Sequence, residues 1–567
     1  MKKLKSIPII LVMLIPLVVY GELVGTGLSA YPWYGGGELV LDVFLYHKQK
    51  VLLTAAGLCL VFLAILCFRK YVQFKAAVFL PFALYVLLAL VSSLFSSYKE
   101  YAFKGAMEQY ESIGVILGYF IICLYANLAY SSDFFILFSI FCSVIGAIGT
   151  LQLFGMDIYR MAVVQKLCMP QKLRGIGFHI TIERGRSYCS LSNPNYAGML
   201  CCLTIPVLTV LFFCAERRWE KMLYGFSAGL MLCSLAGSRS KSGMVVLAMC
   251  MLFLLVLFRK QVPKKQTVLL AVLVLAAGVA AGIFIKKQGG FSGEKNTPDT
   301  SVCSISTGED AVEIVYDDRV LNFQTDYDGV SLDEMIIVTD ENAARYEMTA
   351  HQGILYFKEQ ALSQLSAALA VYGEYTALEI YDGRYYWYFT DQTPNHTWQY
   401  LTRFGKPDRL VSDDIAVFGG LNGRERIVSG RGYIWSRTIP LLKKYLLLGG
   451  GQDCFTVLFP NHDYLGKARW GYKDLIVTKP HCMYMQIAVQ SGLLSLAALL
   501  CFWGSFFIKA VSDQSDSRAS MMARAIAAGV LGYLLMGMTN DSSIGVAPVF
   551  WMLLGTGVHF LNFDKKN

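Results

Sequence analysis

The 567-residue chain is long enough for about three or four soluble domains, but 55% of its residues are apolar and only 16% are charged. A soluble protein needs roughly 25% charged residues to cover its surface, so this composition, with a mean hydropathy of +0.47, excludes that class. The 13% aromatic content and the scattered cysteines also exclude disorder, a collagen-like fibre and a disulfide scaffold.

Twelve runs of the sequence are apolar over the roughly 20 residues that a helix needs to cross about 30 Å of hydrocarbon. The first run follows Lys2, Lys3 and Lys5 and could be read as a signal peptide. No clean cleavage site comes after it, so we interpret it as an uncleaved span. The predicted spans are 6–23, 51–68, 76–95, 112–130, 133–154, 196–214, 221–237, 242–258, 267–285, 485–508, 523–540 and 544–561.

Lysine and arginine residues concentrate in every second loop, and the positive-inside rule assigns those loops to the cytoplasm. Both termini are then cytoplasmic, in a multi-pass protein of the cell membrane. The sequence predicts an all-α polytopic membrane protein of about 12 transmembrane helices, with a large extracytoplasmic loop containing an inserted α+β soluble domain. Its predicted parts are 1–285 (helices one to nine, with the outer loop 155–195), 286–423 (the acidic insert), 424–484 (a basic membrane-proximal catalytic loop) and 485–567 (helices ten to twelve).

The insert is distinguished by its charge. Residues 288–423 hold 22 acidic and 8 basic residues, a net charge of −14 in a chain whose net charge is +9. Apolar and polar residues alternate at period two, as in strands, and Asp382 with Gly383 predicts a hairpin turn. The aromatic residues that follow this turn, 385–389, suit either ordinary strand packing or glycan binding. We expect strands at 311–316, 378–381 and 385–389, a helix around 359–372, and a tether at 290–310.

The membrane-proximal segments are basic although they face outward. Residues 424–484 hold ten lysines and arginines against four acids, and the outer loop 155–195 holds six against two. The positive-inside rule gives no reason for such outer loops. They are either solvated faces that touch lipid phosphates, or two basic loops that converge over one anionic ligand.

Two outer constellations hold arginines that could bind such a ligand. Arg239 and Lys241 lie in a tight turn between two spans, where a charge is expensive unless it is paired or functional. An anchor that snorkels to the headgroups would explain them equally. Arg431 begins a segment that resembles an amphipathic helix on the membrane surface. The glycines at 449–451 indicate a helix stop, because no Gly-Lys-Ser/Thr of a phosphate loop follows them.

A third constellation surrounds His481. Pro480 predicts a helix start that places His481 on the first turn, and an imidazole suits proton transfer near neutral pH. The sequence contains no His-Glu-x-x-His, no paired Cys-x-x-Cys and no EF-hand loop, so we expect neither a metal nor another cofactor. His179 and Glu183 stand four residues apart, and an ion pair explains them better than a metal site.

The order of these features resembles the O-antigen ligase and O-antigen polymerase family of polytopic membrane glycosyltransferases, which carry one large outer loop late in the chain. The resemblance covers about 100–285 and 424–560 and leaves the acidic insert unexplained. Such proteins often have asparagine after the loop histidine, where this chain has Cys482. The matching residues are Asn193-Pro-Asn195, Ser238 with Arg239, Arg431 with Trp435, the turn 449–451, and His481 with Tyr484, Gln486 and Gly492-Leu-Leu494.

The resemblance implies cell-surface polysaccharide biosynthesis, by transfer of a glycan from an undecaprenyl-diphosphate donor to an acceptor hydroxyl outside the membrane. Arg239 and Arg431 would hold the leaving diphosphate, and His481 would be the catalytic base or a further diphosphate contact. The implied enzyme is a metal-independent ligase or polymerase whose acceptor is a glycan, lipid or protein, with contacts to membrane lipids and none to nucleic acid. The predicted substrate-binding residues are Arg174, Arg186, Asn195, Lys241 and Tyr484.

A twelve-span secondary transporter or flippase of a lipid-linked or anionic solute is the alternative. A carrier should show two similar halves and ionisable residues at the bilayer midplane. The predicted spans are almost free of mid-span charge, and one very long outer loop breaks any symmetry. A third interpretation treats the acidic insert as a sensor or binding module, which does not account for the other spans.

Overall fold

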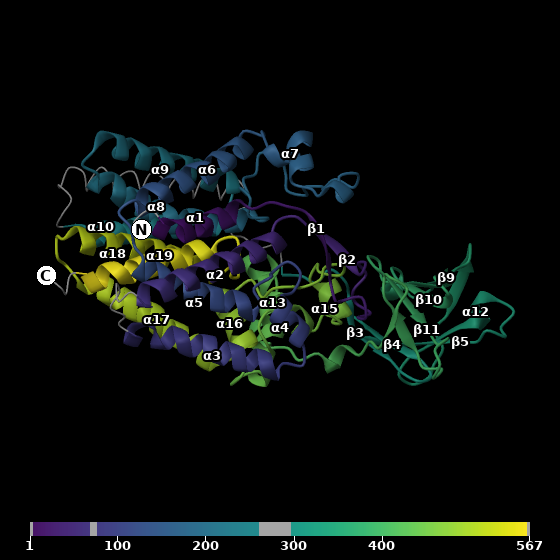
Figure 1. The fold of residues 1–567 in the computed structure, drawn as a ribbon. Helices are drawn as coiled ribbons and strands as arrows, with labels where there is room; N and C mark the ends of the chain where they lie inside the picture. Colours follow the sequence, from purple (N-terminus) through teal and green to yellow (C-terminus); the bar gives the residue numbers. More distant parts are fainter. Residues whose placement is uncertain (1–3, 69–75, 260–295, 564–567) are drawn as a thin grey trace.

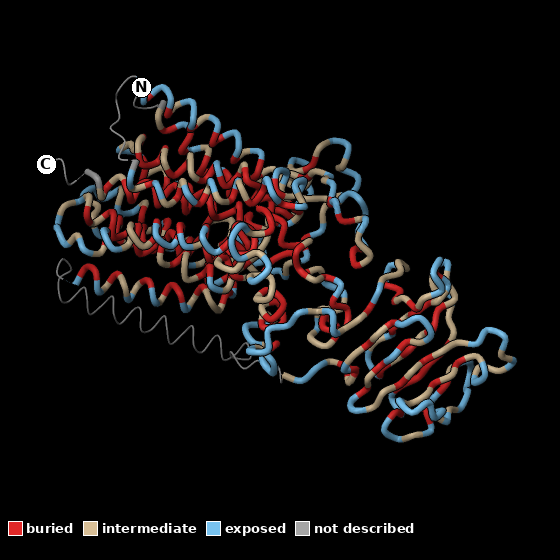
Figure 2. The backbone as a smooth tube through the Cα atoms, turned by 90° about the horizontal axis from the view of Figure 1, so that it is seen from below, coloured by how far each residue is buried: buried red, intermediate tan, exposed pale blue. Residues whose placement is uncertain are grey.

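The computed structural model describes residues 4–68, 76–259 and 296–563, and it shows a long bundle of helices with a β-rich lobe at one end (Figure 1). The apolar runs form the bundle, whose interior is largely buried (Figure 2). Both chain ends lie at the end of the bundle away from the lobe. The bundle helices are α1 (Ile7–Leu14), α2 (Tyr46–Phe68), α3 (Leu80–Phe95), α5 (Ile113–Leu128), α6 (Phe134–Leu153), α8 (Pro194–Cys214), α9 (Arg218–Ser238), α10 (Lys241–Leu257), α16 (Met483–Ser491), α17 (Leu493–Ser512), α18 (Arg518–Met536) and α19 (Ala547–Phe563).

Six helices in the described part of the chain are long and apolar enough to cross a membrane, so this is a multi-pass membrane protein. Eleven of the twelve predicted runs coincide with helices, and the ninth, 267–285, lies outside the described residues. Helix α8 is central, because it packs against α9, α10 and α18 and is buried along almost its whole length. The six helices are Tyr46–Phe68, Ala77–Phe95, Phe134–Leu153, Pro194–Cys214, Leu493–Ser512 and Arg518–Met536.

Two of the predicted runs are not continuous helices. The first is helical only over Ile7–Leu17, because the chain then turns into a strand that begins at Glu22. The tenth breaks between α16 and α17 at Gly492, whose φ of 88° lies in the left-handed region. A Cβ atom at Gly492 would lie 2.1 Å from the carbonyl oxygen of Leu447. The backbone at Leu447 therefore approaches position 492 so closely that only glycine fits there.

Replacement of Gly492 by alanine is expected to lower the unfolding temperature of the detergent-solubilised protein. The positive φ alone costs of order 1–3 kcal/mol for a residue with a side chain, and the clash with Leu447 adds to it. Gly504→Ala is the matched control, because Gly504 lies within α17 and has open space around its Cα. Alanine favours a helix interior over glycine, so this control should keep or raise the unfolding temperature. Equal effects of the two variants would contradict this account of the break.

The lobe consists of two antiparallel sheets. A four-stranded sheet has the order β3-β4-β5-β6, and a seven-stranded sheet has the order β13-β12-β11-β10-β9-β8-β7. Trp387, Phe389 and Phe323 lie in one apolar core that the two sheets share. The strands are β3 (Val302–Thr307), β4 (Val312–Tyr316), β5 (Arg319–Thr325), β6 (Ile336–Thr339), β7 (Met348–His351), β8 (Ile354–Phe357), β9 (Ser366–Tyr372), β10 (Tyr375–Tyr381), β11 (Tyr386–Thr390), β12 (Gln399–Leu401) and β13 (Pro407–Asp408).

The predicted hairpin around Asp382 and Gly383 is confirmed by the pairing of β10 with β11. The predicted helix around 359–372 is wrong, because β9 occupies its second half and pairs with β8 and β10. The insert is therefore not α+β, since the described part of the lobe contains only the single-turn helix α12 (Leu332–Met335) and short 3-10 turns. The predicted tether at 290–310 is also wrong in part, because β3 lies within it.

The lobe is anchored to other outer segments. An N-terminal hairpin that the sequence did not predict contributes Trp33 and Tyr34 to the core of the lobe, and Lys406 Nζ donates to the carbonyl oxygen of Ser29 at 2.7 Å. Arg426 and Asp299 form an ion pair of 2.7 Å where the chain enters and leaves the lobe. The remaining outer elements are β1 (Glu22–Gly25), β2 (Leu39–Asp42), α4 (Lys99–Lys104), α7 (Ala162–Leu167), α13 (Ile427–Lys444), α14 (Phe455–Leu458) and α15 (Tyr464–Arg469).

Candidate functional site

His481 lies at the end of the bundle that carries the lobe, in the turn before α16. The prediction that it occupies the first helical turn is wrong, because α16 begins at Met483 and Cys482 is its N-cap. The backbone of His481 has a φ of 52°, in the left-handed region, so the chain turns sharply here instead of entering the helix directly. Its side chain is 40% exposed, which leaves the imidazole accessible from outside.

A buried carboxylate holds this imidazole. Nδ1 of His481 lies 2.9 Å from Oδ2 of Asp541, whose side chain has no exposed area. The other carboxylate oxygen accepts a hydrogen bond from the backbone N–H of Cys482 at 3.2 Å. Asp541 belongs to the loop between α18 and α19. When Nδ1 donates to Asp541, Nε2 carries the free lone pair, and in the described part of the chain Nε2 has no hydrogen-bond partner.

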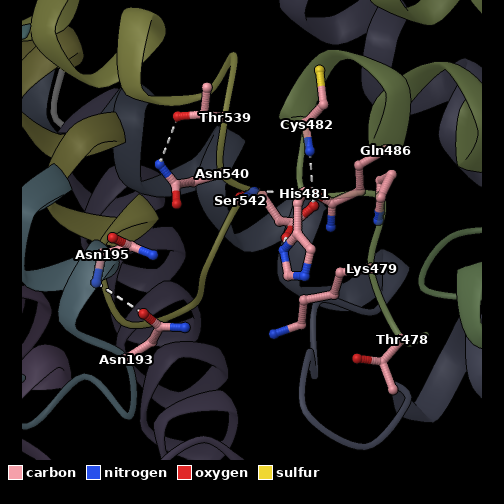
Figure 3. Close-up of polar contacts among 12 residues, drawn as sticks. Asn193, Asn195, Thr478, Lys479, His481, Cys482, Gln486, Thr539, Asn540 and Ser542 are labelled. Atoms are coloured by element: carbon pink, nitrogen blue, oxygen red, sulfur yellow. Dashed lines mark hydrogen bonds and ion pairs between the residues drawn. The ribbon is translucent and has the colours of Figure 1, made fainter. Parts of the chain in front are cut away.

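Lys479 supplies a fixed positive charge beside this pair. Its Nζ is buried and lies 3.3 Å from the hydroxyl of Tyr196 (Figure 3 shows Lys479 next to His481). Burial by itself would lower the pKa of Lys479, but Tyr196, Glu108 and Asp541 raise it overall. The ammonium group therefore stays protonated and offsets the buried carboxylate.

Arg431 supplies a second cation. It lies in α13, directly after three residues in the left-handed region, Val428 to Gly430, which reorient the chain at this point. Burial lowers the pKa of Arg431, while the nearby Asp541 and Tyr472 act in the opposite direction. An arginine nonetheless remains charged at physiological pH. Among the described residues its guanidinium has no hydrogen-bond or ion-pair partner, so it is a poorly solvated cation that an anion would stabilise.

A hydrogen-bond network fixes the Asp541 loop from behind. Ser542 Oγ donates to Oε1 of Glu111 at 2.8 Å, and the Ser542 N–H donates to Oε1 of Gln486 at 2.9 Å. The hydroxyl of Tyr119 donates to the same Glu111 oxygen at 2.5 Å. Burial raises the pKa of Glu111 to about 7, against these hydrogen bonds. A small cavity of about 30 Å³ lies against Glu111, Gln486 and Ser542, so the network borders space for a water molecule.

Arg239 belongs to a second group, in the tight turn between α9 and α10. It caps α9 with a left-handed φ of 53°, and its guanidinium lies 3.5 Å from the carboxylate of Glu183. The side chain of Arg186 donates to the carbonyl oxygen of Ser238 at 3.4 Å, so the outer loop 155–195 closes over this turn. Glu183 therefore pairs with Arg239, and the predicted ion pair between Glu183 and His179 is wrong.

Helix α8 connects the two groups. Asn193 caps the helix by accepting from the N–H of Asn195 at 2.8 Å, and both amides lie opposite His481 and Lys479 (Figure 3). The next residue, Tyr196, contacts Lys479. One turn further on, Gly198 packs so closely on Ser240 that a Cβ atom would lie 2.9 Å from it. The first two turns of α8 thus lie between the Arg239 turn and the His481 turn and contact both of them.

The other predicted substrate-binding residues lie at different depths around this region. Lys241 is the first residue of α10 and is half-buried. Arg174 is exposed on the outer loop. Tyr484 donates its hydroxyl to the carbonyl oxygen of Leu534 at 2.8 Å, which commits it to contact with α18. Their roles in binding stay predictions.

The sequence-based prediction missed four residues that the structure brings to His481. Asp541 and Glu111 are single carboxylates at the edges of apolar runs, where an ionisable group is expensive unless it has a role. The energetic cost of placing a carboxylate there is the feature of the sequence from which both residues could have been identified. Lys479 was recognised as the start of the His481 segment and as one of its basic residues but was given no role, and Tyr196 follows the Asn193-Pro-Asn195 motif directly.

This arrangement can accept a proton and hold an anion at the same place. In the Asp541–His481 pair a carboxylate holds one nitrogen of the imidazole and leaves the other free to act as a base. Arg431 lies near the same carboxylate. In residues 4–68, 76–259 and 296–563 there is no cluster of three or more His, Cys, Asp or Glu side chains that could hold a metal ion. The His481–Asp541 pair and the neighbouring Arg431 support proton transfer beside fixed positive charge.

Comparison with known proteins identifies a family for part of the chain. Residues 226–500 match the family model described as O-antigen ligase. The match begins within α9 and ends within α17, so it includes Arg239, Arg431 and His481 and leaves out Asp541. No curated protein matches the chain, and no solved structure matches it.

Proposed function

The chain carries an O-antigen ligase family domain over residues 226–500, and from this premise we propose that it transfers a glycan from an undecaprenyl-diphosphate-linked donor to an acceptor hydroxyl. The reaction takes place at the outer face of the cell membrane, on the side that carries the lobe, with both termini in the cytoplasm. The observation that carries the proposal is the 2.9 Å contact between His481 and the buried Asp541, beside the unpaired guanidinium of Arg431.

In the proposed step the acceptor oxygen attacks the anomeric carbon of the donor sugar. The bond from that carbon to the phosphate oxygen breaks, and its electron pair leaves on undecaprenyl diphosphate. The hydroxyl proton passes to Nε2 of His481, while Nδ1 keeps its hydrogen bond to Asp541. The carboxylate orients the ring and stabilises the imidazolium that forms.

The leaving diphosphate gains negative charge as this bond breaks, so the step needs cations that are already in place. Arg431 is suited to this task because it is partly desolvated and free of competing carboxylate hydrogen bonds in the described chain. Its planar guanidinium can bind two phosphate oxygens at once. Arg239 is the second candidate, and it would exchange its ion pair with Glu183 for the diphosphate. Arg174, Arg186, Asn195, Lys241 and Tyr484 remain proposed substrate contacts.

Because the donor is already activated as a lipid diphosphate, we propose a metal-independent reaction. The purified protein, reconstituted with an undecaprenyl-diphosphate oligosaccharide and a panel of glycan, lipid and peptide acceptors, is expected to release undecaprenyl diphosphate at the same rate with and without EDTA. The measurement is the amount of lipid diphosphate formed over time. A rate that collapses in EDTA and returns with a divalent cation would contradict metal independence. Passage of the intact lipid-linked glycan across the vesicle membrane without any release would favour a flippase instead.

A further inference from the structure

One face of the seven-stranded sheet in the lobe is lined with tyrosines. Leu378, Ile380, Trp387 and Phe389 point into the core, and the alternation of side chains along a strand sends their neighbours to the opposite face. The cross-strand pairs Glu379 with Tyr388, Tyr381 with Tyr386, and Tyr375 with Tyr372 all belong to this opposite face. The tyrosine face consists of Tyr356 on β8, Tyr372 on β9, Tyr375 and Tyr381 on β10, and Tyr386 and Tyr388 on β11.

The rings on this face form a continuous row. Tyr372 stacks on Tyr388 with a centroid distance of 4.3 Å, and Tyr388 lies 6.4 Å from Tyr386. Tyr386 in turn lies 4.7 Å from Tyr381. The row crosses β9, β10 and β11, because small side chains such as Ala377 lie between the rings and leave room for them.

The row does not serve the core of the lobe. Tyr386 is 49% exposed and Tyr356 is 41% exposed, and none of the six tyrosines belongs to an apolar cluster of the described residues. A contiguous patch of exposed aromatic side chains on a folded protein usually marks a site that binds a ligand or a partner. Tyrosine suits such a surface because its ring is apolar and its hydroxyl stays hydrated.

We propose that the tyrosine face binds a glycan chain, which deepens the proposed function by assigning a site for the polysaccharide that the enzyme handles. Sugar rings present C–H groups that pack on aromatic rings, and hydroxyls that pair with phenol groups and with the carboxylate of Glu379. The net charge of −14 on 288–423 opposes an anionic partner such as a phospholipid surface or nucleic acid. A neutral, hydroxyl-rich chain is the ligand that fits both the rings and the charge.

The strands that carry the tyrosine face contact the segment that carries the candidate site. Lys473 Nζ donates to the carbonyl oxygen of Tyr386 at 2.9 Å and lies 4.7 Å from the ring centre of Trp387. Lys473 and His481 belong to the same connection between α15 and α16. A second contact, the 3.1 Å ion pair of Arg403 with Asp474, joins the same two parts. The tyrosine face is therefore joined directly to the segment that carries the candidate site.

The test measures glycan binding by the full-length protein in lipid nanodiscs, without donor, by saturation-transfer NMR and calorimetry. The probes are neutral hexasaccharides of glucose, N-acetylglucosamine, mannose and galactose, and their disaccharides. At least one hexasaccharide is expected to bind, and more tightly than its disaccharide. Combined replacement of Tyr372 and Tyr388 by alanine should weaken binding roughly tenfold or more, since two ring contacts are lost.

Two further variants separate the tyrosine face from general damage. Glu379→Gln keeps the size of the side chain and should also weaken binding. Tyr327→Ala removes an exposed tyrosine that follows β5, is not one of the six residues of the tyrosine face and donates its hydroxyl to Asp391, and it should bind like the wild type. His481→Ala should bind the glycan as tightly as the wild type, because His481 lies outside the tyrosine face. Glycan binding by the lobe would therefore still be observed if the transfer reaction proposed for His481 were disproved. Absence of binding to every probe, equal binding by all variants, or preferential binding of anionic vesicles would overturn the proposal.

Discussion

Replacement of Asp541 by asparagine is expected to lower the rate of glycan transfer roughly 10²- to 10⁴-fold, as is replacement of His481 by alanine. The asparagine keeps the shape of the side chain, but its amide can donate toward Nδ1 of His481. Nδ1 would then carry the lone pair and Nε2 the proton, so the ring could no longer accept the proton of the acceptor hydroxyl. The measurement is release of undecaprenyl diphosphate by each purified variant at pH 7.

Asp453 provides a matched control for this substitution. It is also buried at the outer end of the bundle, where it accepts hydrogen bonds from the backbone N–H groups of Ala106 and Glu111. Burial raises the pKa of Asp453 to about 8, and its hydrogen bonds come from the backbone of Ala106 and Glu111 and not from His481. Asp453→Asn should therefore transfer glycan at a rate close to wild type. Loss of activity in Asp453→Asn, or full activity in Asp541→Asn, would contradict the role assigned to the His481 pair.

Replacement of Arg431 by alanine is expected to reduce the turnover number roughly 10²- to 10³-fold, the cost of removing one preorganised group that stabilises a developing negative charge. The effect is large because the guanidinium is mostly buried and makes no hydrogen bond or ion pair within the described part of the chain, although the charge of Asp541 lies nearby. Arg431→Lys retains the charge but not the planar fork, so an intermediate rate is expected. Arg239→Ala should cost less, because Arg239 is more exposed and already paired with Glu183.

Arg424 is the matched control for Arg431. It precedes the same helix and is exposed, so Arg424→Ala should retain the wild-type turnover number and affinity for the donor. Both quantities are measured from initial rates at varied donor concentration. A similar loss in Arg424→Ala and Arg431→Ala would indicate a general effect of surface charge on donor binding and would contradict a specific diphosphate contact.

The helices could be predicted from apolar run length alone, but their interruptions could not. The run through Gly492 stays apolar on both sides, so nothing in the composition marks the break that Leu447 imposes. In the lobe, β9 was mistaken for a helix because its Ser366–Tyr372 segment is rich in alanine and leucine, which favour helices. Pairing with β8 and β10 overrides this local preference.

In the candidate site, too, the residues with a local sequence signal were predicted and those defined by contacts between distant segments were not. His481, Arg239 and Arg431 were identified because they are charged or titratable residues in basic outer segments. Asp541 was missed because its contact with His481 joins residues 60 positions apart, and no periodic pattern reports such a pair. Glu111 was missed for the same reason, since its partner Ser542 is 431 positions away.

These separations have a consequence for the biosynthesis of the protein. Glu111 leaves the ribosome early, His481 follows much later, and Asp541 emerges 60 residues after His481. The histidine therefore has no partner while α18 is still being delivered to the membrane. A chain truncated before Asp541 would hold an unoriented imidazole. Under the proposed function, catalytic competence would arise only once the last helices have inserted, so unfinished copies of the chain would not consume the lipid-linked donor.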